Sequence, residues 1–338
     1  MKDLLDYIQD SLYQDLCYTY NVIDESGGLY DGQIDLAAKI SNDIVNHNDN
    51  IMNHNCKQDF TLTYANVGLK NEYFNKLVID VNLWRKTSVN ASIDLYGNLE
   101  SDDPYKKYNY DKSSDKLDIV TITISCNYET SIYSDVIMSR ISHELNHGYV
   151  YWQTIKDDFK ENDKTVPEEI HSKLHEWSNT IYKKIASNII NPTNDEASQI
   201  AYNLIYTLTR YERNAFLAEI VTYLYDNNGK LKDIDNAKQL LSKSSQYRLY
   251  AEEGPEIIDI MKNEWDDKRQ DTLRNAYNTI YNTNYTTSKV LKIIEHKLEE
   301  TIKKINHNIT TICRKLKDGY DIEENLHYMY LPNKIQWF

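Results

Sequence analysis

A segment of helical pattern with two histidines four residues apart constrains this chain more than any other feature. Residues 143–147 read His-Glu-Leu-Asn-His. On an α-helix, positions i and i+4 lie on the same face one turn apart, so both imidazoles can reach one metal ion. Glu144 lies one residue further round the helix, where its carboxylate can face a water held by that metal. Two neutral nitrogen ligands, a carboxylate base and an open coordination position are what a catalytic zinc site requires.

The run from Asp135 to Thr154 predicts one amphipathic helix around this motif. Ser134 and Asp135 offer an N-terminal cap. Gly148, directly after the second histidine, is costly inside a helix, and a close approach of backbone or substrate would explain it. Without a metal, the same stretch would be a surface turn with two exposed histidines. Apolar residues recur at steps of three and four along the run: Val136, Ile137, Ile141, Leu145, Tyr149 and Trp152.

Three runs before this helix alternate as β-strands do. Residues 116–125 place Val120, Ile122 and Ile124 on one face and mostly polar residues on the other. Residues 76–83 and 88–96 are also strand-like, with residues 84–87 as a hairpin turn between them. For residues 58–155 we therefore expect a small, largely antiparallel sheet followed by the histidine-bearing helix. We expect its last strand to be able to pair with an extended peptide, because sheet edges present unpaired N–H and C=O groups.

A third protein ligand must come from outside this helix. Position 153 is Gln, which excludes the metzincin pattern with a third histidine six residues after the second. The run Tyr202 to Asp226 predicts a further helix that carries two candidates, Glu212 and Glu219, on nearly the same face. At 1.5 Å per residue they lie about 10 Å apart along the axis, too far for both to bind one ion.

Glu212 is the favoured ligand of the two. Ala215, one turn later, leaves room for the motif helix to pack close, whereas the bulkier Tyr223 follows Glu219. The alternative for either glutamate is a solvated helix face, where glutamate is usually found.

Together these residues resemble the gluzincin metallopeptidases, the thermolysin-like group whose zinc is held by H-E-x-x-H and a Glu on a later helix. In that group the glutamate commonly opens a Glu-x-x-Ala stretch, and residues 212–219 read Glu-Arg-Asn-Ala-Phe-Leu-Ala-Glu. The same stretch looks like the third-ligand helix of small bacterial and phage-type members. The resemblance covers residues 117–226, about a third of the chain.

The resemblance implies a mostly helical α+β, zincin-like fold and a zinc metalloendopeptidase. One Zn²⁺ would be held by His143, His147 and Glu212, and Glu144 would be the general base in the hydrolysis of a peptide or protein substrate. The alternative is a catalytically silent zincin-like protein with a structural or virion-associated interaction role. The chain departs from thermolysin in having Tyr211 where an Asn precedes the ligand glutamate.

Two further groups of residues stay open. The oxyanion needs a donor besides the metal, and the sequence does not choose among Tyr206, Arg210 and Tyr211. His171 and His175 are also four residues apart, but Ser172 stands where a base would be, so they are either a structural metal pair or exposed side chains.

The charge and residue composition of the chain limit the kinds of binding partner that we expect. A net charge of −14 argues against nucleic acid or an anionic membrane as the main partner and disfavours acidic substrates. No stretch approaches the roughly 20 apolar residues of a membrane span, and the N-terminus has no apolar signal region. The four cysteines form no C-x-x-C pair. We therefore expect a cytoplasmic protein, or one packaged in a virion, since 29 Tyr against 5 Phe suits an AT-rich genome such as that of a phage or low-GC bacterium.

The pattern predicts two parts along the chain. Residues 1–226 would form the metallopeptidase domain and residues 227–338 a C-terminal helical extension. Within the extension, residues 288–317 repeat apolar side chains at helical spacing, which predicts a helix of about 45 Å. We expect this helix to pack back on the body, with a coiled-coil arm as the alternative.

Overall fold

The computed structural model describes ten stretches of the chain: residues 37–42, 44–45, 60–67, 73–84, 90–98, 100–127, 134–161, 184–189, 195–226 and 232–318. Its contacts group into two compact units, Met1–Val166 with Tyr225–Lys232, and Pro167–Leu224 with Asp233–Phe338. The protein is mostly helical with one small mixed sheet, an α+β architecture. The units cut across the expected boundary at residue 226, and the two domains named above stay a prediction.

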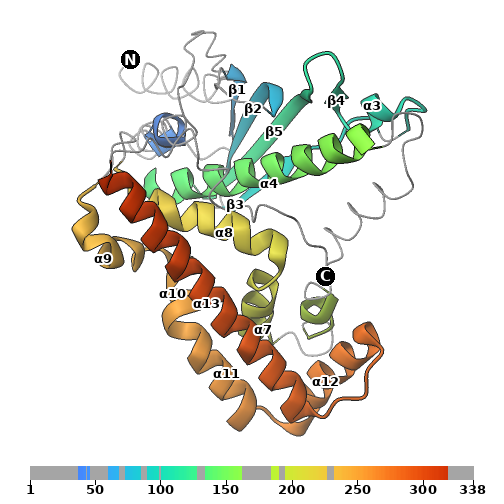
Figure 1. Ribbon diagram of the computed structural model, residues 1–338, viewed down its shortest axis with the longest axis vertical. Coiled ribbons are helices and arrows are strands. Elements are labelled where there is room, and N and C mark those ends of the chain that lie inside the picture. Colours follow the sequence, from blue (N-terminus) through green and yellow to red (C-terminus); the bar gives the residue numbers. More distant parts are fainter. Residues whose placement is uncertain are drawn as a thin grey trace, which may run out of the picture. The chain divides into compact units, whose positions relative to one another are not determined.

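The first unit holds the sheet, whose strand order is β1-β2-β5-β3 (Figure 1). The short β4 also pairs with β5. β2 and β5 run parallel, whereas the β1–β2, β3–β5 and β4–β5 pairs are antiparallel. The strands are β1 Phe60–Val67, β2 Phe74–Trp84, β3 Asn90–Asp94, β4 Tyr110–Asp111 and β5 Lys116–Asn127.

One face of this sheet forms the core of the first unit. The alternation in β5 is confirmed, because Val120, Ile122 and Ile124 are fully buried and the threonines between them are half-buried. In β2, the side chains of Phe74, Leu77, Ile79 and Val81 are buried in the same way. Helix α4, Ser134–Glu161, contacts β3 and β5 and runs across the sheet (Figure 1). The apolar stripe of the helix and the apolar face of the strands therefore bury each other.

Two expectations about strand pairing are wrong. β2 and β3 do not form a hairpin, because β5 lies between them. β5 therefore has partners on both sides and offers no free edge to a peptide; the outer strand on that side is β3. A four-residue gap permits a hairpin but does not require one, and β2 instead pairs with β5 from Phe74 to Trp84.

The predicted motif helix is confirmed, and its glycine is explained by packing. A Cβ on Gly148 would lie 3.2 Å from Cδ1 of Ile93 in β3 and 3.6 Å from side-chain atoms of Leu95 and Tyr73. The 3.2 Å distance is tighter than most Cβ contacts, so glycine lets α4 approach the sheet closely one residue after the second histidine.

We expect Gly148→Val to destabilise the protein by about 1–3 kcal/mol, because its branched side chain overpacks the contact with Ile93. Urea unfolding followed by circular dichroism measures this. Gly148→Ala is the matched control. Its single methyl group makes a milder contact than valine does, and alanine gains ~1 kcal/mol in helix propensity over glycine, so we expect little change in stability. Equal stability of the valine variant and the parent would contradict the close packing.

The second unit is helical. Its elements are α7 Glu196–Thr207, α8 Arg210–Thr222, η1 Ile234–Asn236, α9 Ala237–Leu241, α10 Ser245–Arg248, the π-helix η2 Leu249–Glu253, α11 Gly254–Asn263, α12 Asp267–Tyr281 and α13 Thr287–Lys317. The long C-terminal helix is confirmed, and α13 packs against α11 and α12 of its own unit (Figure 1). A coiled-coil arm is therefore unnecessary to bury its apolar stripe.

The single helix expected over Tyr202 to Asp226 is wrong, because the chain breaks it into α7 and α8. Thr209 is the N-cap of α8 and its side chain accepts a hydrogen bond from the backbone N–H of Glu212. Threonine is a strong capping residue because it satisfies an amide that has no partner within the helix. The break places Glu212 in the first turn of α8.

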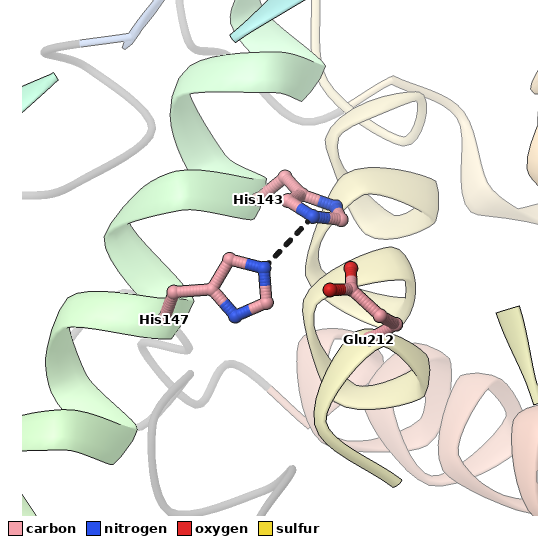
Figure 2. Close-up of side chains that lie close together, drawn as sticks. All are labelled: His143, His147 and Glu212. Atoms are coloured by element: carbon pink, nitrogen blue, oxygen red, sulfur yellow. Dashed lines mark hydrogen bonds between the residues drawn. The ribbon is translucent and has the colours of Figure 1, made fainter. Parts of the chain in front are cut away.

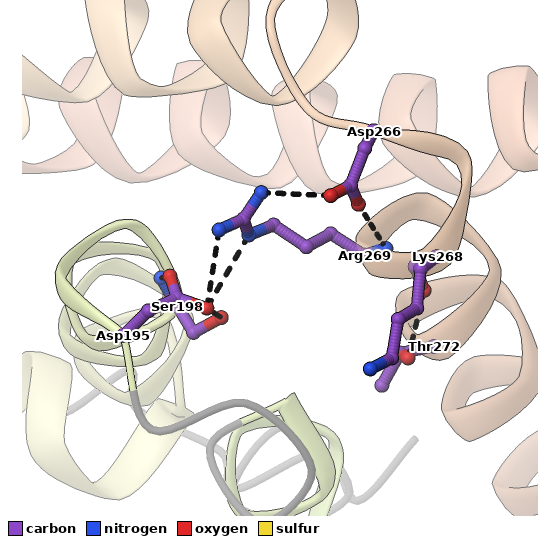
Figure 3. Close-up of polar contacts among 6 residues, drawn as sticks. All are labelled: Asp195, Ser198, Asp266, Lys268, Arg269 and Thr272. Atoms are coloured by element: carbon purple, nitrogen blue, oxygen red, sulfur yellow. Dashed lines mark hydrogen bonds and ion pairs between the residues drawn. The ribbon is translucent and has the colours of Figure 1, made fainter.

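Arg269 ties two helix starts of the second unit together (Figure 3). Its guanidinium forms ion pairs with Asp195, the N-cap of α7, at 3.3 Å and with Asp266, the N-cap of α12, at 3.0 Å. The pKa of Asp195 lies below its ordinary value, mainly because its carboxylate accepts a hydrogen bond from the backbone N–H of Ser198. The nearby charge of Arg269 lowers this pKa further. The start of α7 is therefore fixed against α12.

Candidate metal centre

Helix α4 carries the three residues of the motif in buried positions. His143, Glu144 and His147 are only 6 %, 7 % and 5 % exposed. The fully buried Ile141 and Leu145 fix this turn of the helix against the core. The alternative of a surface turn with exposed histidines is therefore wrong.

The two histidine rings converge on one point. Their Nε2 atoms lie 3.0 Å apart, and the rings are 4.7 Å apart and nearly perpendicular. Figure 2 shows both rings projecting from the same side of α4. Two nitrogens that each lie ~2.0–2.1 Å from a tetrahedral zinc are about 3.3 Å apart. The pair is therefore close to the geometry of two ligands, each presenting Nε2.

Glu212 belongs to the second unit, in the first turn of α8. It is 8 % exposed, and its Oε1 accepts a hydrogen bond of 2.5 Å from the hydroxyl of Tyr206. A helix N-terminus stabilises negative charge, and a hydrogen bond from a hydroxyl does the same. The local structure of this unit thus orients the Glu212 carboxylate.

Glu219 is buried as well, so neither glutamate lies on a solvated helix face. Both lie near enough to the buried Tyr250 to affect it: burial raises the pKa of that phenol most strongly, and the two carboxylates raise it further. Tyr250 stands in the π-helix η2. Sequence reasoning missed this residue, because a π-helix has no sequence pattern of its own.

The other residues considered as ligands or oxyanion donors add nothing to the described site. His171 and His175 lie outside the described residues, as do the side chains of Arg210 and Tyr211. Burial raises the pKa of the Cys126 thiol to about 12, which disfavours the thiolate form that binds metals. The described donors of the motif on α4 are thus two imidazoles and the carboxylate of Glu144.

Comparison with protein-family models, curated proteins and solved structures finds no match to this chain. In the described part of the chain, no helix is both long enough and apolar enough to cross a membrane. What the protein does must therefore follow from the chemistry of its own residues.

Proposed function

We propose that the chain is a zinc metallopeptidase in which His143, His147 and Glu212 bind one Zn²⁺ and Glu144 is the general base. The observation that carries this proposal is the convergence of the two buried histidines on α4, whose Nε2 atoms lie 3.0 Å apart (Figure 2) beside the buried Glu144. Glu212, buried in the first turn of α8, is the third ligand expected from the sequence. Two imidazole nitrogens and one carboxylate oxygen are a donor set typical of catalytic zinc, which keeps a fourth position open for water or substrate.

Glu144 supplies the proton transfers of the proposed reaction. When bound, zinc would lower the pKa of a water ligand toward ~7 and polarise the scissile carbonyl. Glu144 accepts a proton from the attacking water as its oxygen bonds to the carbonyl carbon. The same carboxyl then donates that proton to the amide nitrogen as the C–N bond breaks. One group thus serves first as base and then as acid, and ends in its starting state.

A peptide substrate fits the first unit. β3 contacts α4, which carries the motif, and is the outer strand on that side of the sheet among the described strands. An extended peptide can add to such an edge through backbone hydrogen bonds. The net charge of −14 favours substrates that are neutral or basic.

The proposal is tested by the zinc content of the purified chain. We expect about one zinc per chain by plasma mass spectrometry, and loss of that zinc in His143→Ala and in His147→Ala, because each removes a ligand. His296→Ala is the matched control, since this histidine is exposed on α13. Full zinc occupancy in both α4 variants would contradict the site.

A further inference from the structure

We propose that Tyr206 is a positioning residue for Glu212, which it holds in the orientation needed to bind the metal. This inference rests on the proposed zinc site and deepens it, because it assigns a role to a side chain outside the motif and the ligand set. It depends on contacts within the second unit alone.

The geometry carries the assignment. Tyr206 lies in the last turn of α7 and Glu212 in the first turn of α8, and the hydroxyl donates to Oε1 at 2.5 Å. Each oxygen of a carboxylate has two lone pairs, so a hydrogen bond to Oε1 is compatible with metal binding by the same carboxylate. It also fixes the terminal torsion of a long side chain that otherwise loses rotamer freedom when it binds.

Tyr206 itself is held by its surroundings. Its ring stacks on that of Tyr202, with centroids 5.9 Å apart and planes 8° from parallel. The turn after it is anchored by the buried hydroxyl of Tyr250, which donates to the backbone carbonyl of Thr207 at 2.6 Å. Thr209 then caps α8 by accepting from the N–H of Glu212. These contacts restrain both the Tyr206 hydroxyl and the Glu212 carboxylate that accepts its hydrogen bond.

This arrangement separates two roles for Tyr206. As an oxyanion donor it would leave zinc affinity unchanged and affect kcat alone. As a positioning residue it would affect zinc affinity itself. A phenol has a single O–H to donate, and here that donor is directed at Glu212. The geometry therefore favours positioning.

The test is the zinc affinity of Tyr206→Phe, measured by competition with a chromophoric chelator on the full chain. Loss of an outer hydrogen bond to a metal ligand typically costs 10–100-fold in affinity, and we expect a loss in that range. Tyr202→Phe is the matched control, one turn earlier on the same helix, and should bind zinc as the parent does. The visible absorption of the Co²⁺-loaded protein should change in Tyr206→Phe and not in Tyr202→Phe.

A double-mutant cycle with Glu212→Gln separates positioning from a general loss of structure. If Tyr206 acts through the carboxylate, removing its hydroxyl should change the residual zinc affinity of Glu212→Gln far less than that of the parent. An equal loss in both backgrounds, or an unchanged affinity in Tyr206→Phe, would overturn the inference. Failure of the zinc site itself would look different, because zinc would then persist in His143→Ala and His147→Ala.

Discussion

Glu144→Gln should retain one zinc per chain and lose peptide hydrolysis by about 10²–10⁴-fold, the usual contribution of a general base. Glutamine keeps the shape of the side chain but cannot take a proton from water. Glu144 is buried on α4 beside both histidines, so the substitution alters the chemistry at a fixed position. Turnover of a quenched fluorescent peptide library and zinc content, measured on the same samples, give the two numbers.

The same pair of measurements separates an enzyme from its silent alternative. A zinc-loaded parent chain that cleaves no member of the library, nor unfolded casein, would favour the structural or virion-associated interaction protein. Parent and Glu144→Gln samples with equal turnover would refute the role of Glu144. His296 is exposed on α13, so we expect the His296→Ala variant to match the parent in both turnover and zinc content.

Glu212→Ala should weaken zinc binding far more than Glu219→Ala does. Removal of a ligand costs more than the 10–100-fold expected for loss of an outer hydrogen bond, whereas Glu219 lies about 10 Å further along α8 at 1.5 Å per residue. Both glutamates are buried on the same helix, so each variant leaves a comparable change in packing and each controls for the other. Chelator competition with zinc measures the two affinities. The opposite order would move the third ligand to Glu219.

The elements predicted well from sequence are those whose pattern is local. The helix around His143 and His147, the alternation of Val120, Ile122 and Ile124, and the long C-terminal helix all follow from periodicities within one segment. In such segments the spacing of the apolar side chains alone indicates which face is buried. Burial of the motif histidines follows from the same helix, because their turn is bracketed by core residues.

The structural features that the sequence did not predict depend on pairing between segments distant in sequence, or on a capping signal of only a few residues. The insertion of β5 between β2 and β3 follows from strand pairing, which a single segment does not encode. The break between α7 and α8 had a local signal, because Thr209 precedes Glu212 by three residues, a spacing typical of an N-cap and its helix. The hydrogen bond from Tyr206 to Glu212 follows from that break, since it joins the end of one helix to the start of the next.

Anomalous diffraction at the zinc absorption edge from crystals of the full chain locates the metal and identifies its ligands. We expect one strong peak at ~2.0–2.2 Å from Nε2 of His143, Nε2 of His147 and a carboxylate oxygen of Glu212. No peak on zinc-supplied crystals, or a peak bound by other residues such as His171 and His175, would contradict it.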